Sequence, residues 1–171
     1  MTAHIEPTLT HSQTHHSQML EQVTALAQAK NQQDIESSLG IYHQDAELIT
    51  PSLNAHGIGA AQVRQQLELF FNVFPDYKVT LEQHAFNGNL LLATGQVTVT
   101  PTLSPAISNK PLPTVTVPVF IEFHFKDGKI TKEVFHLDIE HIYKKSGLTK
   151  QSLYMNNQLF INTKKAGLHH A

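Results

Sequence analysis

The segment Phe123–Asp138 (FHFKDGKITKEVFHLD) constrains the fold of this chain more than any other. Apolar residues alternate on both sides of Asp127-Gly128, which indicates a β-hairpin because glycine takes the positive φ that such a turn needs. On the second strand, His136 and Asp138 lie two residues apart and therefore share one face. An acid beside an imidazole on a largely apolar sheet indicates a small-molecule pocket.

The remaining pattern predicts helices first and strands afterwards. Apolar residues at helical spacing predict three helices, over residues 17–30, 34–42 and 60–73. Alternation and turn residues predict five strands, over residues 46–50, 77–86, 90–100, 114–126 and 129–142. This order predicts an α+β fold in which the N-terminal helices pack on one face of a curved antiparallel β-sheet.

We expect one domain with a segment on each side of it. Residues 1–17 are predicted to form a flexible arm, residues 18–148 the domain, and residues 149–171 a C-terminal extension with a short helix around 152–160. The arm is polar and holds too few apolar groups to repay the entropy of ordering. The extension has apolar residues to bury, so we expect it to dock on its own domain or on a partner.

Composition argues against several classes of function. The net charge of 171 residues is −2, and Arg64 is the only arginine, so nothing favours binding to nucleic acid or to an anionic membrane. Cysteine is absent, which excludes disulfides and thiolate chemistry. No apolar run approaches the roughly 18 residues of a membrane helix. The N-terminus lacks the apolar core of a signal peptide, so we expect a cytoplasmic protein.

Twelve histidines are unusual for a chain of this length. Six of them lie in the polar terminal segments: His4, His11, His15, His16, His169 and His170. Our interpretation is that they are solvated tails, with a weak adventitious metal site as the alternative. No His-Glu-x-x-His spacing occurs, and we expect no metal and no cofactor.

Several short motifs occur in an order and spacing that identify a family. They are Asn31-Gln-Gln-Asp34, Tyr42-His-Gln-Asp-Ala46, Gly57, Phe74-Pro-Asp76, Asn87-Gly88, Asp127-Gly-Lys-Ile130, Asp138 and Gly147-Leu148. Together they resemble the NTF2-like superfamily and, within it, the SnoaL-like polyketide cyclases and ester cyclases. The resemblance covers about residues 18–148 and implies a cone-shaped α+β barrel.

The resemblance also implies functional residues. In these cyclases an aspartate at the end of the last strand acts as general acid/base, and Asp138 stands at that position. A histidine on the preceding strand assists in some members, and His124 is the nearest candidate. The tryptophan usual four residues before the aspartate is Val134 here. Ketosteroid isomerases of the same superfamily place a general-base aspartate where this chain has Thr50, which argues against their mechanism.

Each candidate catalytic residue has a structural alternative. Asp138 would have its pKa raised by an apolar cone and could exchange protons with substrate, or it could be an exposed acid at a strand end. His136 could orient the carboxyl group or polarise a carbonyl, or it could be a packed core histidine. Simple alternation places His124 in solvent, opposite the face of Ile121 and Phe123.

A closed cone would still leave a pocket role open for His124, because helices could cover one face of the sheet and a partner subunit the other. A strand bulge would instead reverse the alternation and bring Glu133 inward. The candidate substrate contacts are Tyr42, Thr50, Phe70 and Phe74. The aromatic residues among them are more often core than substrate contacts, but we expect at least one of them to line the cavity.

Our leading hypothesis is a cofactor-independent enzyme, a cyclase or a related isomerase or hydrolase, acting on an apolar carbonyl-containing small molecule. The alternative is a non-catalytic module on the same fold that binds a small molecule or another protein. A long curved sheet with apolar residues on both faces needs cover beyond three helices. We therefore expect a homodimer that packs sheet against sheet.

Overall fold

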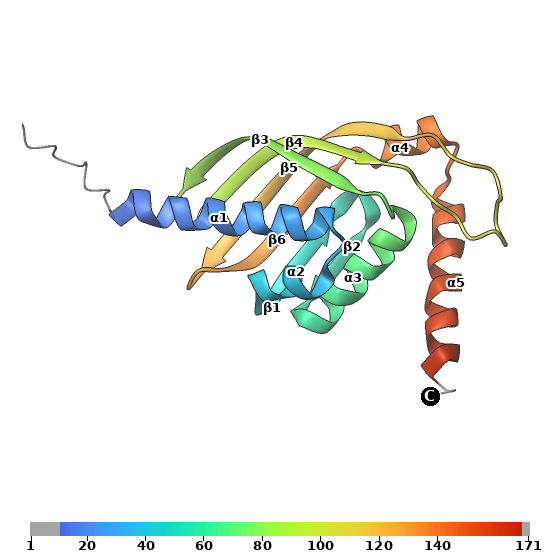
Figure 1. The fold of residues 1–171 in the computed structure, drawn as a ribbon, viewed down its shortest axis with the longest axis horizontal. Helices are drawn as coiled ribbons and strands as arrows, with labels where there is room; N and C mark the ends of the chain where they lie inside the picture. Colours follow the sequence, from blue (N-terminus) through green and yellow to red (C-terminus); the bar gives the residue numbers. More distant parts are fainter. Residues whose placement is uncertain (1–10, 169–171) are drawn as a thin grey trace, which may run out of the picture.

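A curved sheet of six strands organises the chain in a computed structural model that describes residues 11–168 (Figure 1). The strands are β1 (Tyr42–Thr50), β2 (Ala55–Ile58), β3 (Lys78–Asn87), β4 (Leu90–Val99), β5 (Val115–Lys126) and β6 (Lys129–Leu137). The helices are α1 (His11–Asn31), α2 (Ile35–Ile41), α3 (Gly59–Val73), α4 (Ile139–Ser146) and α5 (Lys150–Leu168), with a short 3₁₀ helix η1 (Pro51–Leu53). The predicted α+β class is confirmed.

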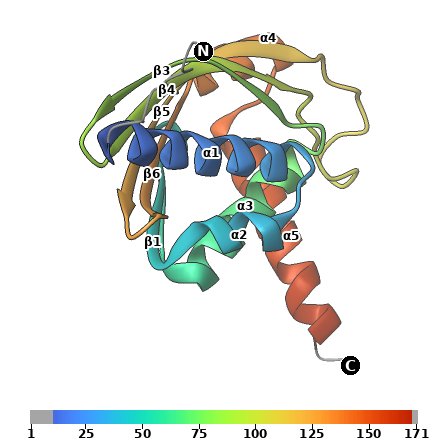
Figure 2. The ribbon, with the colours of Figure 1, turned by 60° about the vertical axis from the view of Figure 1, so that its left-hand side comes forward.

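Strand order across the sheet is β2-β1-β6-β5-β4-β3. Within the described sheet four neighbouring pairs are antiparallel, as predicted, and β1 runs parallel to β6. The sheet curves without closing, and its hollow side holds α1, α2 and α3 (Figure 2). None of the helices within residues 11–168 is both long and apolar enough to cross a membrane.

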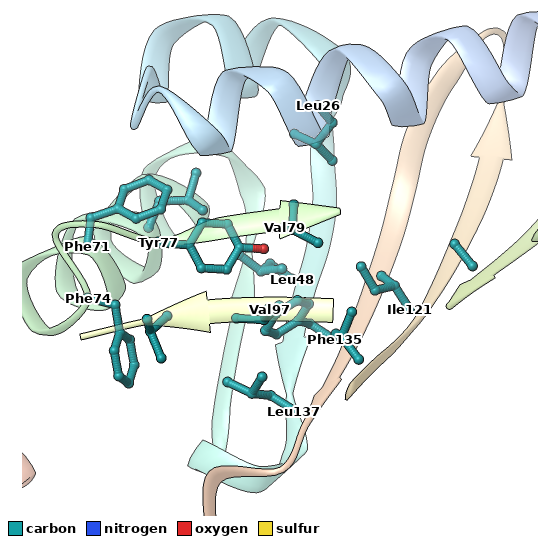
Figure 3. Close-up of a cluster of buried hydrophobic side chains, with 14 of the residues drawn as sticks. Leu26, Leu48, Phe71, Phe74, Tyr77, Val79, Val97, Ile121, Phe135 and Leu137 are labelled. Carbon is teal, nitrogen blue, oxygen red and sulfur yellow. The ribbon is translucent and has the colours of Figure 1, made fainter. Parts of the chain in front are cut away.

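The core lies on the concave face of the sheet. Strand β5 shows why: Val117, Val119, Ile121 and Phe123 are buried there, whereas the alternate residues face outward. Side chains from α1, α3 and the strands meet in this layer, as Figure 3 shows for Leu26, Phe71, Ile121 and Phe135. Removal of these apolar groups from water is the main stabilising contribution.

Helix α1 begins at His11, earlier than the predicted start at residue 17. His16 stacks on Phe86 with ring centroids 4.3 Å apart, and the Nε2 of His15 lies 2.9 Å from the Oδ1 of Asn89. The first helical turns therefore pack against the β3–β4 hairpin, so the interpretation of His15 and His16 as a solvated tail was wrong. Residues 1–10 and 169–171, with His4, His169 and His170, lie outside the described residues.

Strand β6 ends at Leu137, and the predicted strand up to residue 142 was wrong. Asp138 is the N-cap of α4, because its carboxylate accepts the backbone N–H of His141 at 3.0 Å. Lys144 and Lys145 lie in the last turn, and Gly147, with a φ of 71°, ends the helix. These are ordinary helix signals, which the apolar alternation through Leu137 and Ile139 obscured.

The C-terminal extension folds as helix α5 beside α3 (Figure 1). Leu153 is buried, and the Oδ1 of buried Asn156 accepts the backbone N–H of Ser104 at 2.6 Å. The extension thus packs on its own domain and on the loop that joins β4 to β5. Tyr154 is 65% exposed and Leu159 is 38% exposed, so the outer side of α5 remains in solvent.

Candidate functional site

A bulge in β6 turns Glu133 toward the core. Ile130 pairs with Phe125 and Lys132 pairs with His124, which leaves Thr131 as an extra residue. Ile130 and Glu133 are both buried although they are three residues apart, an arrangement that a regular strand cannot give. The hypothesis that a bulge brings Glu133 inward is confirmed.

The carboxylate of Glu133 is held by two buried partners. The Nζ of Lys30 donates to its Oε1 at 2.6 Å and to its Oε2 at 2.8 Å, and the hydroxyl of Tyr42 donates to Oε2 as well. Glu133 is 1% exposed and Lys30 is 8% exposed. A buried charge is costly unless it is paired and hydrogen-bonded, and this arrangement meets both needs.

Two tyrosine hydroxyls lie in the field of the same carboxylate. Burial raises the pKa of Tyr42 well above the ordinary value of a tyrosine, and the charge and hydrogen bond of Glu133 add to the shift. Burial and the charge of Glu133 likewise raise the pKa of Tyr77. Both hydroxyls therefore stay protonated, and Tyr42 remains a hydrogen-bond donor to Glu133.

A cavity of about 140 Å³ lies beside this charged pair. Most of its wall is apolar and includes Leu48, Phe70, Phe71, Phe74, Phe135 and Leu153. Its polar lining is Lys30, Thr50, Gln66, Tyr77, Glu133 and Asn157. Figure 3 shows Phe71, Phe74, Tyr77 and Phe135 gathered at this side of the core. An apolar cavity with a few polar groups is the usual form of a small-molecule site, and cavities of about this size hold a benzene ring.

Three of the four predicted substrate contacts line this cavity. Thr50 is the last residue of β1, Phe70 lies in the last turn of α3, and Phe74 is the C-cap of that helix. Tyr42 contacts Glu133 behind the wall instead of lining the cavity. The substrate-binding role of all four residues stays a prediction.

The predicted catalytic residues lie on the other face of the sheet. The Nε2 of His136 is 3.1 Å from the Oε1 of Glu122, and its side chain is 42% exposed. The Nε2 of His124 is 3.9 Å from the other carboxylate oxygen of Glu122. His136 and Asp138 line one shallow surface groove, which is separate from the cavity. Their catalytic role stays a prediction, while the structure gives Asp138 a capping role.

That capping role predicts a stability effect. Asp138→Ala removes the acceptor for the backbone N–H of His141 and should cost about 0.5–2 kcal/mol of the free energy of unfolding. Asp138→Asn keeps an acceptor oxygen and should cost much less. Urea denaturation of the two variants measures the difference, and equal losses would contradict the capping role.

Family models and solved structures place this architecture among known proteins. The sequence model of the SnoaL-like domain matches residues 23–133. The chain belongs to the SnoaL-like domain family. The matched segment begins within α1 and ends at Glu133, so it contains the whole Lys30–Tyr42–Glu133 cluster. Among curated proteins, none matches this SnoaL-like chain in sequence.

Solved structures share the fold of this SnoaL-like domain at low sequence identity. A protein from Jannaschia sp. CCS1 described as a SnoaL-like polyketide cyclase is 19% identical, with a TM-score of 0.67 over 78% of this chain and 94% of its own. TerC, co-crystallised with polyporic acid, is 20% identical, with a TM-score of 0.64 over 75% of this chain and 97% of its own. A ketosteroid isomerase-like protein from Catenulispora acidiphila, in complex with trimethylamine, is 16% identical, with a TM-score of 0.67 over 77% of this chain and 95% of its own. At these identities the likeness concerns the fold alone.

Sequence reasoning missed Lys30 as a site residue of this SnoaL-like domain. Lys30 follows Met19, Val23 and Leu26 on the buried stripe of α1. A lysine in an apolar stripe implies a buried counter-charge, which is the signal that was available. Its partner lies 103 residues away, so the pairing itself needed the structure. Within residues 11–168, no three acidic or histidine side chains are grouped so that they could hold a metal ion.

Proposed function

We propose that this SnoaL-like domain takes an apolar, carbonyl-containing small molecule of about one ring into the cavity and acts on it by acid/base catalysis without a cofactor. The observation that carries the proposal is the buried Lys30–Glu133 pair in the wall of an otherwise apolar cavity. A carboxylate beside an ammonium in a cavity wall is placed to exchange a proton with a bound molecule and to stabilise the charge that develops on it. The proposal places the acid/base chemistry at Glu133 and not at Asp138.

The chemistry divides between the two charged groups. Glu133 would take a proton from the carbon next to the carbonyl group, while the electron pair of the broken C–H bond moves toward the carbonyl oxygen. Two N–H groups of Lys30 suffice for its bonds to Glu133, and an ammonium has a third. That third donor would stabilise the developing enolate, and Glu133 would then return the proton to a carbon or to an alkoxide.

One observation favours the non-catalytic alternative. Both oxygens of Glu133 already accept hydrogen bonds, from Lys30 and from Tyr42. These donors hold the carboxylate in place and compete with a ligand for its oxygens. A domain that only binds a carbonyl compound would use the same pair to orient the ligand.

An exchange assay separates the two candidates. Acetophenone, cyclohexenone and cyclohexanone, each with a single ring, are tested for binding by ligand-observed NMR. Loss of the acetophenone methyl signal in D₂O then reports removal of protons next to the carbonyl group. Faster loss with the protein than without it supports catalysis. Binding without faster loss supports the ligand-binding alternative, and the absence of binding by all three compounds contradicts both.

We further propose that the protein is a homodimer that packs through the outer face of the sheet. Phe120 is 37% exposed there, and Leu92 and Val134 on the same face are only half-buried. Glu122 lies beside His124 and His136, so a two-fold related copy would present histidines to its acid and an acid to its histidines. Sedimentation at micromolar concentration should give a dimer, and a monomer would contradict this proposal.

A further inference from the structure

Helix α5 contributes one polar side chain to the cavity. Asn157 follows Leu153 by four residues, so the two side chains project from the same side of the helix, and both line the cavity. The hydrogen bond from the backbone of Ser104 to Asn156 fixes this turn of α5 against the β4–β5 loop. The position of Asn157 is therefore set by its neighbours and not by any bond of its own amide oxygen.

That amide oxygen is buried without a partner. Among the described residues, the Oδ1 of Asn157 is one of three buried side-chain atoms that make no hydrogen bond. Buried polar atoms in folded proteins almost always have a partner, because leaving one unpaired costs stability. Leucine would fill a similar volume without that cost. A side chain that weakens the fold and faces a ligand cavity points to a role in binding.

We propose that Asn157 determines specificity by accepting a hydrogen bond from a hydroxyl or amine group of the ligand. This inference rests on the proposed function and narrows its substrate class. The ligand would be a monocyclic carbonyl compound that also carries a hydrogen-bond donor. Its carbonyl group would accept a hydrogen bond from Lys30 of α1, and its donor would bind the amide oxygen of Asn157 of α5. Two distant parts of the chain would thus each bind one polar group of the ligand.

A matched pair of ketones tests the assignment. 4-Hydroxyacetophenone differs from acetophenone by one hydroxyl group, and a gained hydrogen bond should make it bind about tenfold tighter to the wild-type protein. Asn157→Leu should remove this preference, chiefly by weakening 4-hydroxyacetophenone, while acetophenone binds as before or tighter. NMR titration gives the four dissociation constants.

Thermal unfolding without ligand distinguishes this role from a structural one. Asn157→Leu removes an unpaired buried atom and should leave the Tm unchanged or higher. The control Asn156→Leu breaks a bond to Ser104 and should lower it.

A clear fall in the Tm of Asn157→Leu would overturn the inference. If Asn157→Leu still prefers 4-hydroxyacetophenone, the inference is also overturned, but the proposed function stands. If neither ketone binds to the wild-type protein, both the inference and the proposed function are rejected.

Discussion

Glu133→Gln should destabilise the domain by about 3–5 kcal/mol, because it leaves the ammonium of Lys30 buried without a counter-charge. Glutamine fills the same space, so the loss reports the missing charge and not a cavity. The hydroxyl of Tyr42 cannot replace the lost charge, because it is neutral and donates a hydrogen bond. Urea denaturation followed by far-UV circular dichroism measures the loss.

Two control variants isolate the cause. Glu122→Gln removes a carboxylate that pairs with His136 on the outer face, where exposed pairs contribute at most about 1 kcal/mol. The double variant Lys30→Met/Glu133→Leu replaces both buried charges by apolar groups and should recover part of the stability, because it still leaves the hydroxyl of Tyr42 without an acceptor. A Glu133→Gln variant as stable as Glu122→Gln would contradict the buried ion pair.

The same double variant should abolish catalysis without unfolding the protein. General acid/base groups contribute about 10²–10⁴-fold to rate, so exchange of the acetophenone methyl protons should slow by that factor in Lys30→Met/Glu133→Leu. The cavity wall becomes wholly apolar at this position, which should leave the binding of a purely apolar ligand such as benzene intact. The rate of signal loss in D₂O gives the effect.

Asp138→Asn is the matched comparison for this activity. It removes the proton-exchanging group on the outer face and keeps the cap of α4. If the cavity is the active site, its exchange rate should equal that of the wild-type protein. A loss of about 10²–10⁴-fold in Asp138→Asn, with normal exchange in the double variant, would move the acid/base role back to Asp138.

Local signals in the sequence were sufficient for most of the fold. Asp127-Gly128 and Asn87-Gly88 each place a positive φ on glycine, and each joins the strands that it was predicted to join. The alternation from Val119 to Phe125 predicts which face of β5 is buried. Asp34 caps α2 because a short polar side chain before an apolar helix can accept a backbone N–H.

The site was harder to predict because it depends on one irregular residue. Without the bulge at Thr131, the register set by the Asp127-Gly128 turn would place Glu133 on the outer face with His124, and the buried charge would not exist. The sequence is compatible with a bulge at this position, but nothing in it specifies one. The alternation through Leu137 and Ile139 predicts a strand at Asp138, although an aspartate before an apolar residue and a glycine nine residues later are also signals of a helix.

The location of a bound ligand shows whether the cavity beside Lys30 and Glu133 is the functional site. In a titration of the isotopically labelled protein with 4-hydroxyacetophenone, the NMR signals of Phe70, Phe135 and Leu153 should shift most, since these residues line the cavity. The signals of Phe120, His136 and Asp138 should stay in place, because they line the groove on the outer face. If the largest shifts occur at those three residues and the signals around Glu133 are unchanged, the ligand binds in the groove and the cavity is not the functional site.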